Sequence, residues 1–402
     1  MTHFSKVILV TLVIFLLAWI LPWSYYFMTS RPHSYPFTLY SCITHSFASV
    51  NFRNDKLNYQ DSRGNTFTED QFDSILPTFY YHRLVSSGRF PKEIEGQEIT
   101  LADIKRENFI FRHAPSDVNT TRPPLYPLLE TMPKRGELEM PEDVFRIHKR
   151  MEFIEMATNT IREDKSALFT QILKKKNFNF PARYIAGNPS TRKEYDEGYF
   201  ITDKNAQLFH VKQLCGRPYV KNTDIPETIR PKYIFPTEYP GRHTYCFLTD
   251  TTNYFYALKA PDYALYKLPL PSFNPEKETL LIVGDAFYWT IQISGNNGRK
   301  FYAVNARDYT LADTLSLTAP PQKASQTAAY IFPFQLSFTS YNDNWVYPRF
   351  SGPSARAFLL NIMLAVVYWI IRRKSDHPAT VPAIVICFLG IFSWIPFLIF
   401  RP

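Results

Sequence analysis

The chain has 402 residues, 45% of them hydrophobic and 16% aromatic, which is enough apolar material for a core and excludes a disordered or low-complexity chain. Four cysteines in this length exclude a disulfide-dense scaffold. The net charge of +9 is too small for the length to indicate a nucleic-acid-binding surface, so no nucleic-acid partner is expected.

The first predicted element is an apolar segment at the N-terminus. Residues 7–30 contain no charged residue, and their length is sufficient to cross a bilayer. The aromatic residues Trp23, Tyr25 and Tyr26 continue this stretch, where a signal peptide would carry a small-residue cleavage site. We therefore expect residues 1–29 to form an uncleaved transmembrane anchor.

Residues 30–195 alternate between strand-like and helix-like stretches. The clearest helix is expected over residues 164–176, where apolar residues recur at helical spacing after Asp164, a residue that can cap a helix. Prolines concentrate in residues 119–127 and predict an ordered loop. This part of the chain is expected to be a mixed α/β extracytoplasmic region.

An internal repeat begins after residue 196. Residues 200–212 align without a gap on residues 247–259, and residues 255–265 align on residues 301–311. The two offsets, 47 and 46 residues, match the period of a four-stranded propeller blade. Each unit consists of an apolar strand, a polar turn and a second strand, so the repeat predicts a series of hairpins.

These hairpins predict a β-rich, propeller-like region over residues 196–350. About three blades are visible, whereas a closed propeller has four or more. Two arrangements account for the difference: an open array capped by the first half of the chain, or further blades hidden before residue 196. We expect the open array.

Two further uncharged segments lie near the C-terminus, over residues 357–371 and 378–400. The first rises only about 22 Å as a helix, so Arg356 and Arg372 must extend toward the membrane interfaces. We expect residues 354–402 to form a transmembrane helical hairpin. The expected fold class is therefore α+β, with three transmembrane helices, one N-terminal and two C-terminal.

The basic loop Arg372-Arg373-Lys374 sets the expected orientation. By the positive-inside rule this loop lies in the cytoplasm, as does Lys6, so residues 30–355 lie outside. No ionisable residue lies within the three apolar segments. The segments are therefore expected to be anchors rather than an ion pathway.

Two thiol-imidazole pairs are the candidate site residues: Cys42 with His45, and His243 with Cys246. Together they supply the donors of a Cys₂His₂ site for zinc or copper, provided that the fold brings them together. The alternatives are one disulfide among Cys42, Cys215 and Cys246, or unreactive thiols and surface histidines. We expect unreactive thiols, and hence no metal and no other cofactor.

The chain contains none of the common catalytic motifs that we sought. It has no nucleophile elbow, metalloprotease helix, Walker loop or dinucleotide-binding turn. The recurrent acids Asp203, Asp250 and Asp308 are expected to accept hydrogen bonds within turns. Aromatic residues of the repeats are expected to fill the core, with those at loop ends free to recognise a sugar, a peptide or a partner protein.

Four segments near the start of the repeats carry a resemblance to a known family. They are Phe180-Pro-Ala-Arg183, Gly187-Asn-Pro189, Asp196-Glu-Gly-Tyr199-Phe200 and His210-Val-Lys212. With the plan of one anchor, an outward domain and a terminal hairpin, they resemble an uncharacterised family of bacterial three-span membrane proteins of unknown function, often encoded beside ABC transporter subunits. The resemblance implies an inner-membrane protein with a large periplasmic domain, and it supplies no catalytic or binding residues.

These expectations combine into a membrane-anchored periplasmic binding or accessory module, non-enzymatic, that couples to a membrane partner such as an ABC transporter complex. The alternative is an envelope metal-binding or metal-dependent protein that uses Cys42, His45, His243 and Cys246. A structural assembly factor is the third possibility. The expected partners are the lipid bilayer and ABC transporter subunits, and the ligand is not specified by the sequence.

Overall fold

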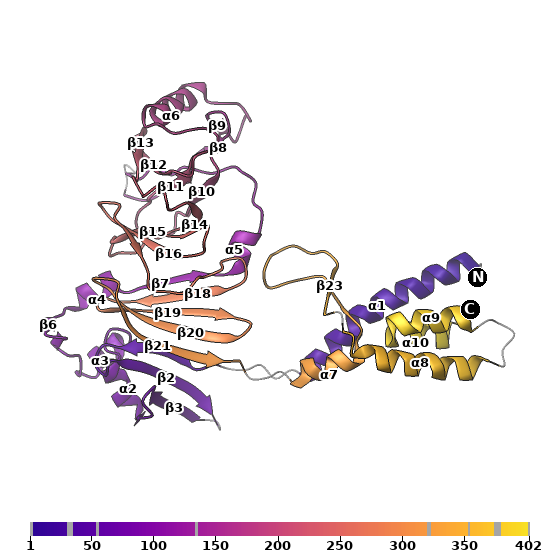
Figure 1. The fold of residues 1–402 in the computed structure, drawn as a ribbon. Helices are drawn as coiled ribbons and strands as arrows, with labels where there is room; N and C mark the ends of the chain where they lie inside the picture. The colour runs from indigo at the N-terminus through magenta and orange to yellow at the C-terminus, as the bar shows by residue number, and fades with distance from the viewer. Residues whose placement is uncertain are drawn as a thin grey trace. The chain divides into compact units, whose positions relative to one another are not determined.

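The computed structural model describes residues 3–29, 35–53, 56–132, 136–319, 323–352, 354–373 and 379–400. The chain divides into two compact units (Figure 1): a sheet unit, Tyr35–Thr318, and a helical unit, Met1–Ser34 with Ala319–Pro402. Part of the predicted basic loop, Lys374, lies outside the described residues. So do Pro378, where the last predicted span begins, and the terminal residues 401–402.

The sheet unit is built from four large antiparallel sheets. The first sheet contains β1 (Phe37–Ser41), β2 (Ser46–Arg53), β3 (Lys56–Asp61) and β4 (Thr66–Phe67). The second contains β10 (Tyr184–Gly187), β11 (Tyr199–Thr202), β12 (Leu208–Leu214) and β13 (Arg217–Asn222). The third contains β14 (Pro231–Pro236), β15 (Thr244–Asp250), β16 (Phe255–Lys259) and β17 (Leu265–Lys267). The fourth follows the order β21 (Leu311–Thr318), β20 (Gly298–Asn305), β19 (Tyr288–Gly295), β18 (Thr279–Gly284) and β7 (Phe109–His113).

The predicted repeat is confirmed as a repeated hairpin. β11 pairs with β12, β15 with β16 and β19 with β20, all antiparallel. Each hairpin lies in the interior of its sheet, with a strand on either side. Asp203 and Asp250 close the first two hairpins in the same way, because each carboxylate accepts two backbone N–H bonds at 2.8–2.9 Å. These acids therefore act within turns, as the sequence predicted.

The four sheets pack face to face in a stack (Figure 1). The second sheet contacts the third through a buried cluster that includes Phe200, Ile234 and Leu248. The third contacts the fourth through a larger cluster, and the first sheet covers the opposite face of the fourth, where Tyr40 meets Phe301. Within the described part of the chain the sheets close into no barrel and no ring. The structure thus has stacked antiparallel sheets and no closed propeller.

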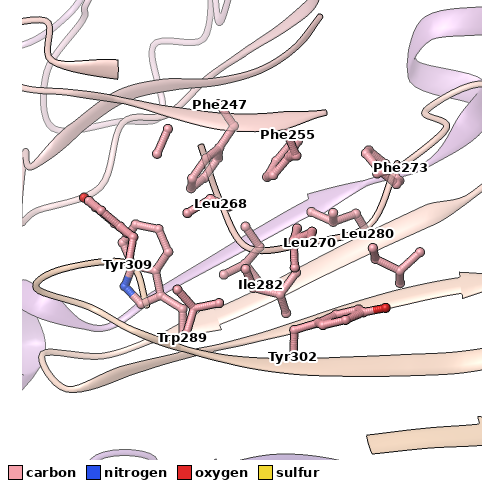
Figure 2. Packing of buried hydrophobic residues seen from close by; sticks show 14 of the residues in the cluster. Phe247, Phe255, Leu268, Leu270, Phe273, Leu280, Ile282, Trp289, Tyr302 and Tyr309 are labelled. Carbon is pink, nitrogen blue, oxygen red and sulfur yellow. The ribbon is translucent and has the colours of Figure 1, made fainter. Parts of the chain in front are cut away.

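Aromatic side chains fill the interface between the third and fourth sheets (Figure 2). Trp289 of β19 lies 5.9 Å from Phe247 of β15, measured between ring centroids, and 5.3 Å from Phe109 of β7. It also lies 5.1 Å from Tyr309. All three contacts are edge to face, the geometry in which aromatic pairs attract beyond simple burial. For Phe247, Trp289 and Tyr309 the prediction that repeat aromatics form the core is confirmed.

Elements from the first half of the chain cover both ends of this stack. β8 (Asp143–Ile147), β9 (Met151–Glu155) and α6 (Glu163–Lys175) pack on the second sheet through a buried aromatic cluster. At the other end α2 (Glu69–Ile75) packs Phe72 on the first sheet. The predicted helix over residues 164–176 is confirmed as α6, shifted by one residue.

The remaining elements of the sheet unit are short: α3 (Tyr81–Ser86), β5 (Glu93–Ile94), β6 (Gln97–Glu98), α4 (Leu101–Glu107) and α5 (Pro115–Asn119). Helix α4 begins after Thr100, whose hydroxyl accepts the Asp103 N–H while the Asp103 carboxylate accepts the Thr100 N–H. Thr68 and Gln71 form the same capping box at α2. Such boxes satisfy two otherwise free backbone donors, which fixes where each helix begins.

Strand β7 comes from the first half of the chain but joins the last sheet. It pairs antiparallel with β18, so that Phe109 lies opposite Gly284 and His113 opposite Leu280. The predicted boundary at residue 196 also falls within one sheet, because β10 and β11 are hydrogen-bonded neighbours. The structure therefore places the two predicted extracytoplasmic regions in one compact unit up to Thr318.

The helical unit contains five helices and a small sheet within the described residues. They are α1 (His3–Thr29), α7 (Lys323–Ile331), β22 (Gln335–Ser337), β23 (Arg349–Ser351), α8 (Ala357–Arg372), α9 (Thr380–Leu389) and α10 (Ile391–Ile399). Ala328 and Phe332 pack against Ala18 of α1 and Phe392 of α10. Residues 323–350, which the sequence placed in the repeat region, therefore belong to the helical unit.

Only α1 is both long and apolar enough to cross a membrane among the described helices. Membrane anchors and signal sequences share these properties. Helices α8 and α9 are also apolar, but they have 16 and 10 residues. The last predicted span is wrong as a single helix, because α9 ends at Leu389 and α10 begins at Ile391. Three separate spans are thus not established by the structure.

Gly390 separates α9 from α10. Its φ of 53° and ψ of −133° form a backbone conformation that residues with a Cβ rarely adopt. A Cβ at Gly390 would lie 2.1 Å from Oδ1 of Asn361, whose amide nitrogen donates to the Cys387 carbonyl at 3.3 Å. The helix therefore breaks where α8 approaches the glycine most closely. Asn361 thus joins α8 to α9.

Candidate functional site

The first predicted thiol-imidazole pair lies at the end of β1. The Cys42 side chain is buried beside Ile94, Ile104 and Phe287, and burial raises the pKa of its thiol well above the usual range. His45 is exposed, and its Nδ1 lies 3.8 Å from a carboxylate oxygen of Glu95. A buried neutral thiol is a poor metal ligand, because the thiolate is the form that binds.

The second predicted pair lies in and beside the third sheet. Cys246 of β15 is fully buried in the cluster between the second and third sheets. His243 is exposed, and its Nε2 lies 2.9 Å from a carboxylate oxygen of Glu107. The structure therefore does not bring the four residues together. In the described residues no three potential ligands form a metal-binding group, and Cys42, Cys215, Cys246 and Cys387 are all free thiols.

A cavity of about 310 Å³ opens between the first sheet, the α2–α3 connection and the fourth sheet. Its walls are largely apolar and include Leu39, Phe79, Ile110 and Val283. The lining also includes residues with polar groups, among them Tyr40, Thr78, Asn108, Asp285, Tyr288 and Thr290. An apolar cavity with a few polar groups is the usual form of a small-molecule site.

Asp285 supplies the carboxylate of this cavity. Its Oδ1 accepts the backbone N–H groups of Phe287 and Tyr288, both at 2.8 Å. Its Oδ2 accepts the Thr78 hydroxyl at 2.6 Å. Burial raises the pKa of Asp285 above the usual range for aspartate, although these three hydrogen bonds oppose the shift. A carboxylate accepts about four hydrogen bonds in all, so Asp285 retains capacity for a donor from a ligand.

Asn108 and Tyr288 complete the polar part of the lining. The amide nitrogen of Asn108 donates to the Thr78 carbonyl at 2.7 Å, while its Oδ1 is buried without a hydrogen-bond partner in the part of the protein described. Burial and the nearby Glu95 carboxylate raise the pKa of Tyr288 to about 12. Its hydroxyl therefore stays protonated at neutral pH. Because the Tyr288 hydroxyl is hydrogen-bonded to Glu95, the cavity offers a ligand an unused amide acceptor and a carboxylate.

Two of the segments that carry the family resemblance contribute Asn188 and Asp196 to the surroundings of a different polar cluster, which we call the Lys193 cluster (Lys193, Asp196 and Glu238). Their side chains are only 2–7% exposed. The Lys193 ammonium donates to Oδ1 of Asp196, to Oε1 of Glu238 and to the Asn188 carbonyl, each at 2.6 Å. All three ammonium protons are engaged. The cluster therefore has no free donor for a ligand, and its role is to join the β10–β11 loop to the β14–β15 connection.

His210 of β12 lies next to this cluster and is fully buried. Its Nε2 donates to the Glu197 carbonyl, since a carbonyl oxygen only accepts, and its Nδ1 accepts the Tyr263 hydroxyl at 2.9 Å. Burial, assisted by the positive charge of Lys212, lowers the pKa of His210 to about 3. His210 is therefore neutral in the folded protein and joins β12 to the loops that carry Glu197 and Tyr263.

Sequence reasoning missed Asp285 and the cavity. Asp285 follows strand β18 and accepts backbone N–H groups two and three residues ahead in a turn, so its sequence pattern is that of a turn acid. What distinguishes Asp285 is its second oxygen, which lies in a cavity assembled from segments far apart in the chain. The sequence around Asp285 offers no signal that would set it apart from the other turn acids.

Comparison with known proteins finds one matching family, and the match lies within the sheet unit. The family described as "Domain of unknown function (DUF4857)" matches residues 37–304, about two thirds of the chain. This range covers most of the sheet unit and none of the apolar helices. Nothing among the curated proteins or the solved structures matches the chain. The predicted resemblance to an uncharacterised family is thus confirmed at the level of a domain of unknown function.

Proposed function

Because the chain belongs to the DUF4857 family, for which no function is known, we propose its function from its own residues. The protein is a membrane-anchored binding module without enzymatic activity. Its sheet unit binds a small amphiphilic molecule outside the cytoplasm, and its helical unit couples this binding to a membrane partner. The observation that carries the proposal is the cavity that contains Asp285.

The lining of the cavity favours a ligand with an apolar body and a hydrogen-bond donor. Leu39, Phe79 and Val283 offer apolar contacts, which favour a ligand that removes its own apolar surface from water. Asp285 and the unpaired Oδ1 of Asn108 are acceptors, so they favour an N–H or O–H group on the ligand. The combination of a nearly saturated turn acid and apolar walls supports binding rather than catalysis.

Membrane attachment is supported by the surface of the helical unit. Large apolar side chains are exposed along α1, among them Leu12 at 62% and Trp23 at 60%. Those of α8 are exposed to a similar degree, with Leu359 at 76%. Contiguous apolar surface of this kind is unfavourable in water and favourable in lipid. We propose that α1 and α8 span the membrane and that the α9–α10 pair lies in it, interrupted at Gly390.

The orientation follows from the charges at the helix ends. Lys6 lies near the start of α1, and Arg372 and Arg373 lie at the end of α8. If both positions face the cytoplasm, the sheet unit between α1 and α8 lies outside. We propose the periplasmic side of a bacterial inner membrane, and an ABC transporter complex as the partner, which is the setting that the family resemblance implies.

The orientation predicts the labelling of one thiol. Cys215 is exposed in the β12–β13 turn, whereas Cys42 and Cys246 are buried. A membrane-impermeant maleimide is expected to label the protein in intact spheroplasts, and Cys215→Ser is expected to abolish the label. Labelling that requires lysis of the inner membrane would contradict the proposed orientation.

Blocking the cavity is expected to remove the bound molecule. Ile110 lies on β7 in the cavity lining and is 61% exposed, so Ile110→Trp fills the opening at little cost to the core. The full chain is purified in mild detergent, and small molecules released on denaturation are identified by mass spectrometry. We expect a molecule with an apolar body and a donor group, and about tenfold less of it on Ile110→Trp, since tenfold corresponds to only 1.4 kcal/mol.

Leu57→Trp is the matched control, because Leu57 is 56% exposed on β3 and lies outside the cavity lining. It should retain the molecule at the wild-type level. Equal amounts in all three proteins, or none in any of them, would overturn the proposed binding function. Transporter subunits that co-purify with both tryptophan variants would support the partner independently of the ligand.

A further inference from the structure

A second depression lies on the fourth sheet and carries the opposite charge. Its volume is about 480 Å³, and its lining includes Arg112, Arg299, Gln292, Thr279, Tyr35 and Phe37. The proposed function does not use this site. Its composition differs from that of the Asp285 cavity, because the charged groups here are mainly cationic.

The strand register places the polar lining on one sheet face. Arg112 of β7 lies opposite Leu281 of β18, and Leu281 lies opposite Gln292 of β19. Side chains directly opposite in neighbouring strands project from the same face. Arg299 of β20 lies opposite Ser294, two residues beyond Gln292, and so shares this face. Two guanidinium groups thus flank a floor that contains Leu281 and Gln292.

The two arginines are available for an anion. Among the described residues, neither forms an ion pair with a carboxylate. The Arg299 guanidinium lies over the ring of Tyr35, 4.5 Å from its centroid, which orients it through a cation–π contact. The one carboxylate in the lining, Asp117, already accepts the Ala114 N–H at 2.8 Å. The lining therefore carries an excess of positive charge.

We propose that this depression binds an oxyanion, a phosphate or carboxylate, attached to an apolar or aromatic body. Guanidinium groups bind such anions through paired N–H donors, and Gln292 adds one amide proton, since its other amide proton is donated to the Ser294 hydroxyl at 2.9 Å. Phe37 and Leu281 contact the apolar body. This proposal does not depend on the Asp285 cavity, so a negative result for anion binding leaves the proposed function untouched.

Phenyl phosphate is the probe, added to the full chain in nanodiscs of zwitterionic phosphatidylcholine. We expect a rise in the unfolding temperature that saturates with phenyl phosphate, and none with benzyl alcohol, which has the same aromatic body without the anion. Arg112→Ala and Arg299→Ala should each weaken binding about tenfold or more, because each removes a charge-assisted donor. Arg112→Lys should bind with intermediate affinity, since it keeps the charge and loses the paired donors.

Arg307→Ala is the matched control, because Arg307 is exposed in the β20–β21 turn and lies outside the lining. It should bind like the wild type. A second arm replaces part of the lipid by anionic phosphatidylglycerol and omits phenyl phosphate. Stabilisation in this arm that Arg112→Ala removes identifies a lipid headgroup as the source of the anion, whereas a response to phenyl phosphate alone identifies a soluble anion. No response in either arm, or equal losses in Arg112→Ala and Arg307→Ala, would overturn the proposal.

Discussion

Lys193→Ala is expected to lower the free energy of unfolding of the sheet unit by about 3–5 kcal/mol. The substitution removes the only cation bonded to Asp196 and Glu238 among the described contacts of these residues, and it leaves two carboxylates buried side by side. Burial already raises the pKa of Glu238, which shows how unfavourable its charge is there. Urea denaturation of the full chain, followed by circular dichroism at pH 7.5, measures the loss.

Lys204→Ala is the control for this prediction, because Lys204 is exposed in the β11–β12 turn. Its effect should stay within about 0.5 kcal/mol. A triple variant, Lys193→Met with Asp196→Asn and Glu238→Gln, should recover part of the loss, since no charge then remains buried. A loss below 1 kcal/mol in Lys193→Ala would show that the Lys193 cluster does not stabilise the sheet unit as proposed.

Acid is expected to destabilise the sheet unit through His210. The pKa of His210 is about 3 in the folded protein and near 6.5 when unfolded. Protons therefore bind preferentially to the unfolded chain, and the contribution of His210 is complete above pH 6.5 and is lost as the pH falls toward 3. The loss is about 1.4 kcal/mol per pH unit in this window, or about 3 kcal/mol between pH 7.5 and 4.5.

His210→Gln isolates this contribution, because glutamine is neutral and still offers a donor and an acceptor. The difference in unfolding free energy between wild type and His210→Gln should shrink as the pH falls from 7.5 to 4.5. Any constant loss of packing cancels from this comparison, as does the titration of His113, which both proteins share. His82→Gln, at an exposed position, should keep the wild-type slope. Parallel curves for wild type and His210→Gln would refute the expectation.

The local part of the fold was predictable from the sequence. The hairpins of the repeat depend on alternating apolar strands and on turn acids such as Asp203 and Asp250, whose hydrogen bonds reach only two to four residues along the chain. Helix α6 likewise depends on the spacing of its own residues. Such short-range patterns are legible in one sequence because the interacting groups are neighbours.

The arrangement of the sheets was not predictable in the same way. The pairing of β7 with β18 joins segments about 170 residues apart, and nothing in Phe109–His113 specifies that partner. At the break, Asn361 of a different helix lies where a side chain at position 390 would be, and nothing local in the sequence specifies that neighbour. A single sequence shows that a segment is apolar, but it does not show which surface the segment meets.

The candidate site also depends on long-range contacts that the sequence does not show. Cys42 and His45 were chosen because thiols and imidazoles bind metals, yet Cys42 is buried and His45 faces Glu95. The Asp285 cavity was missed because Thr78, Asn108 and Asp285 come from three separate parts of the chain. Their chemistry becomes visible only when the fold places them on one surface.

Strand β7 is synthesised long before its partner strand β18. At a synthesis rate of 5–20 residues per second, β18 emerges roughly 10–30 s after β7. During this interval β7 is an unpaired strand that carries Ile110 and Phe111, and such strands template aggregation. A truncation before Thr279 removes the partner strand of β7 and is therefore expected to aggregate rather than to fold in part.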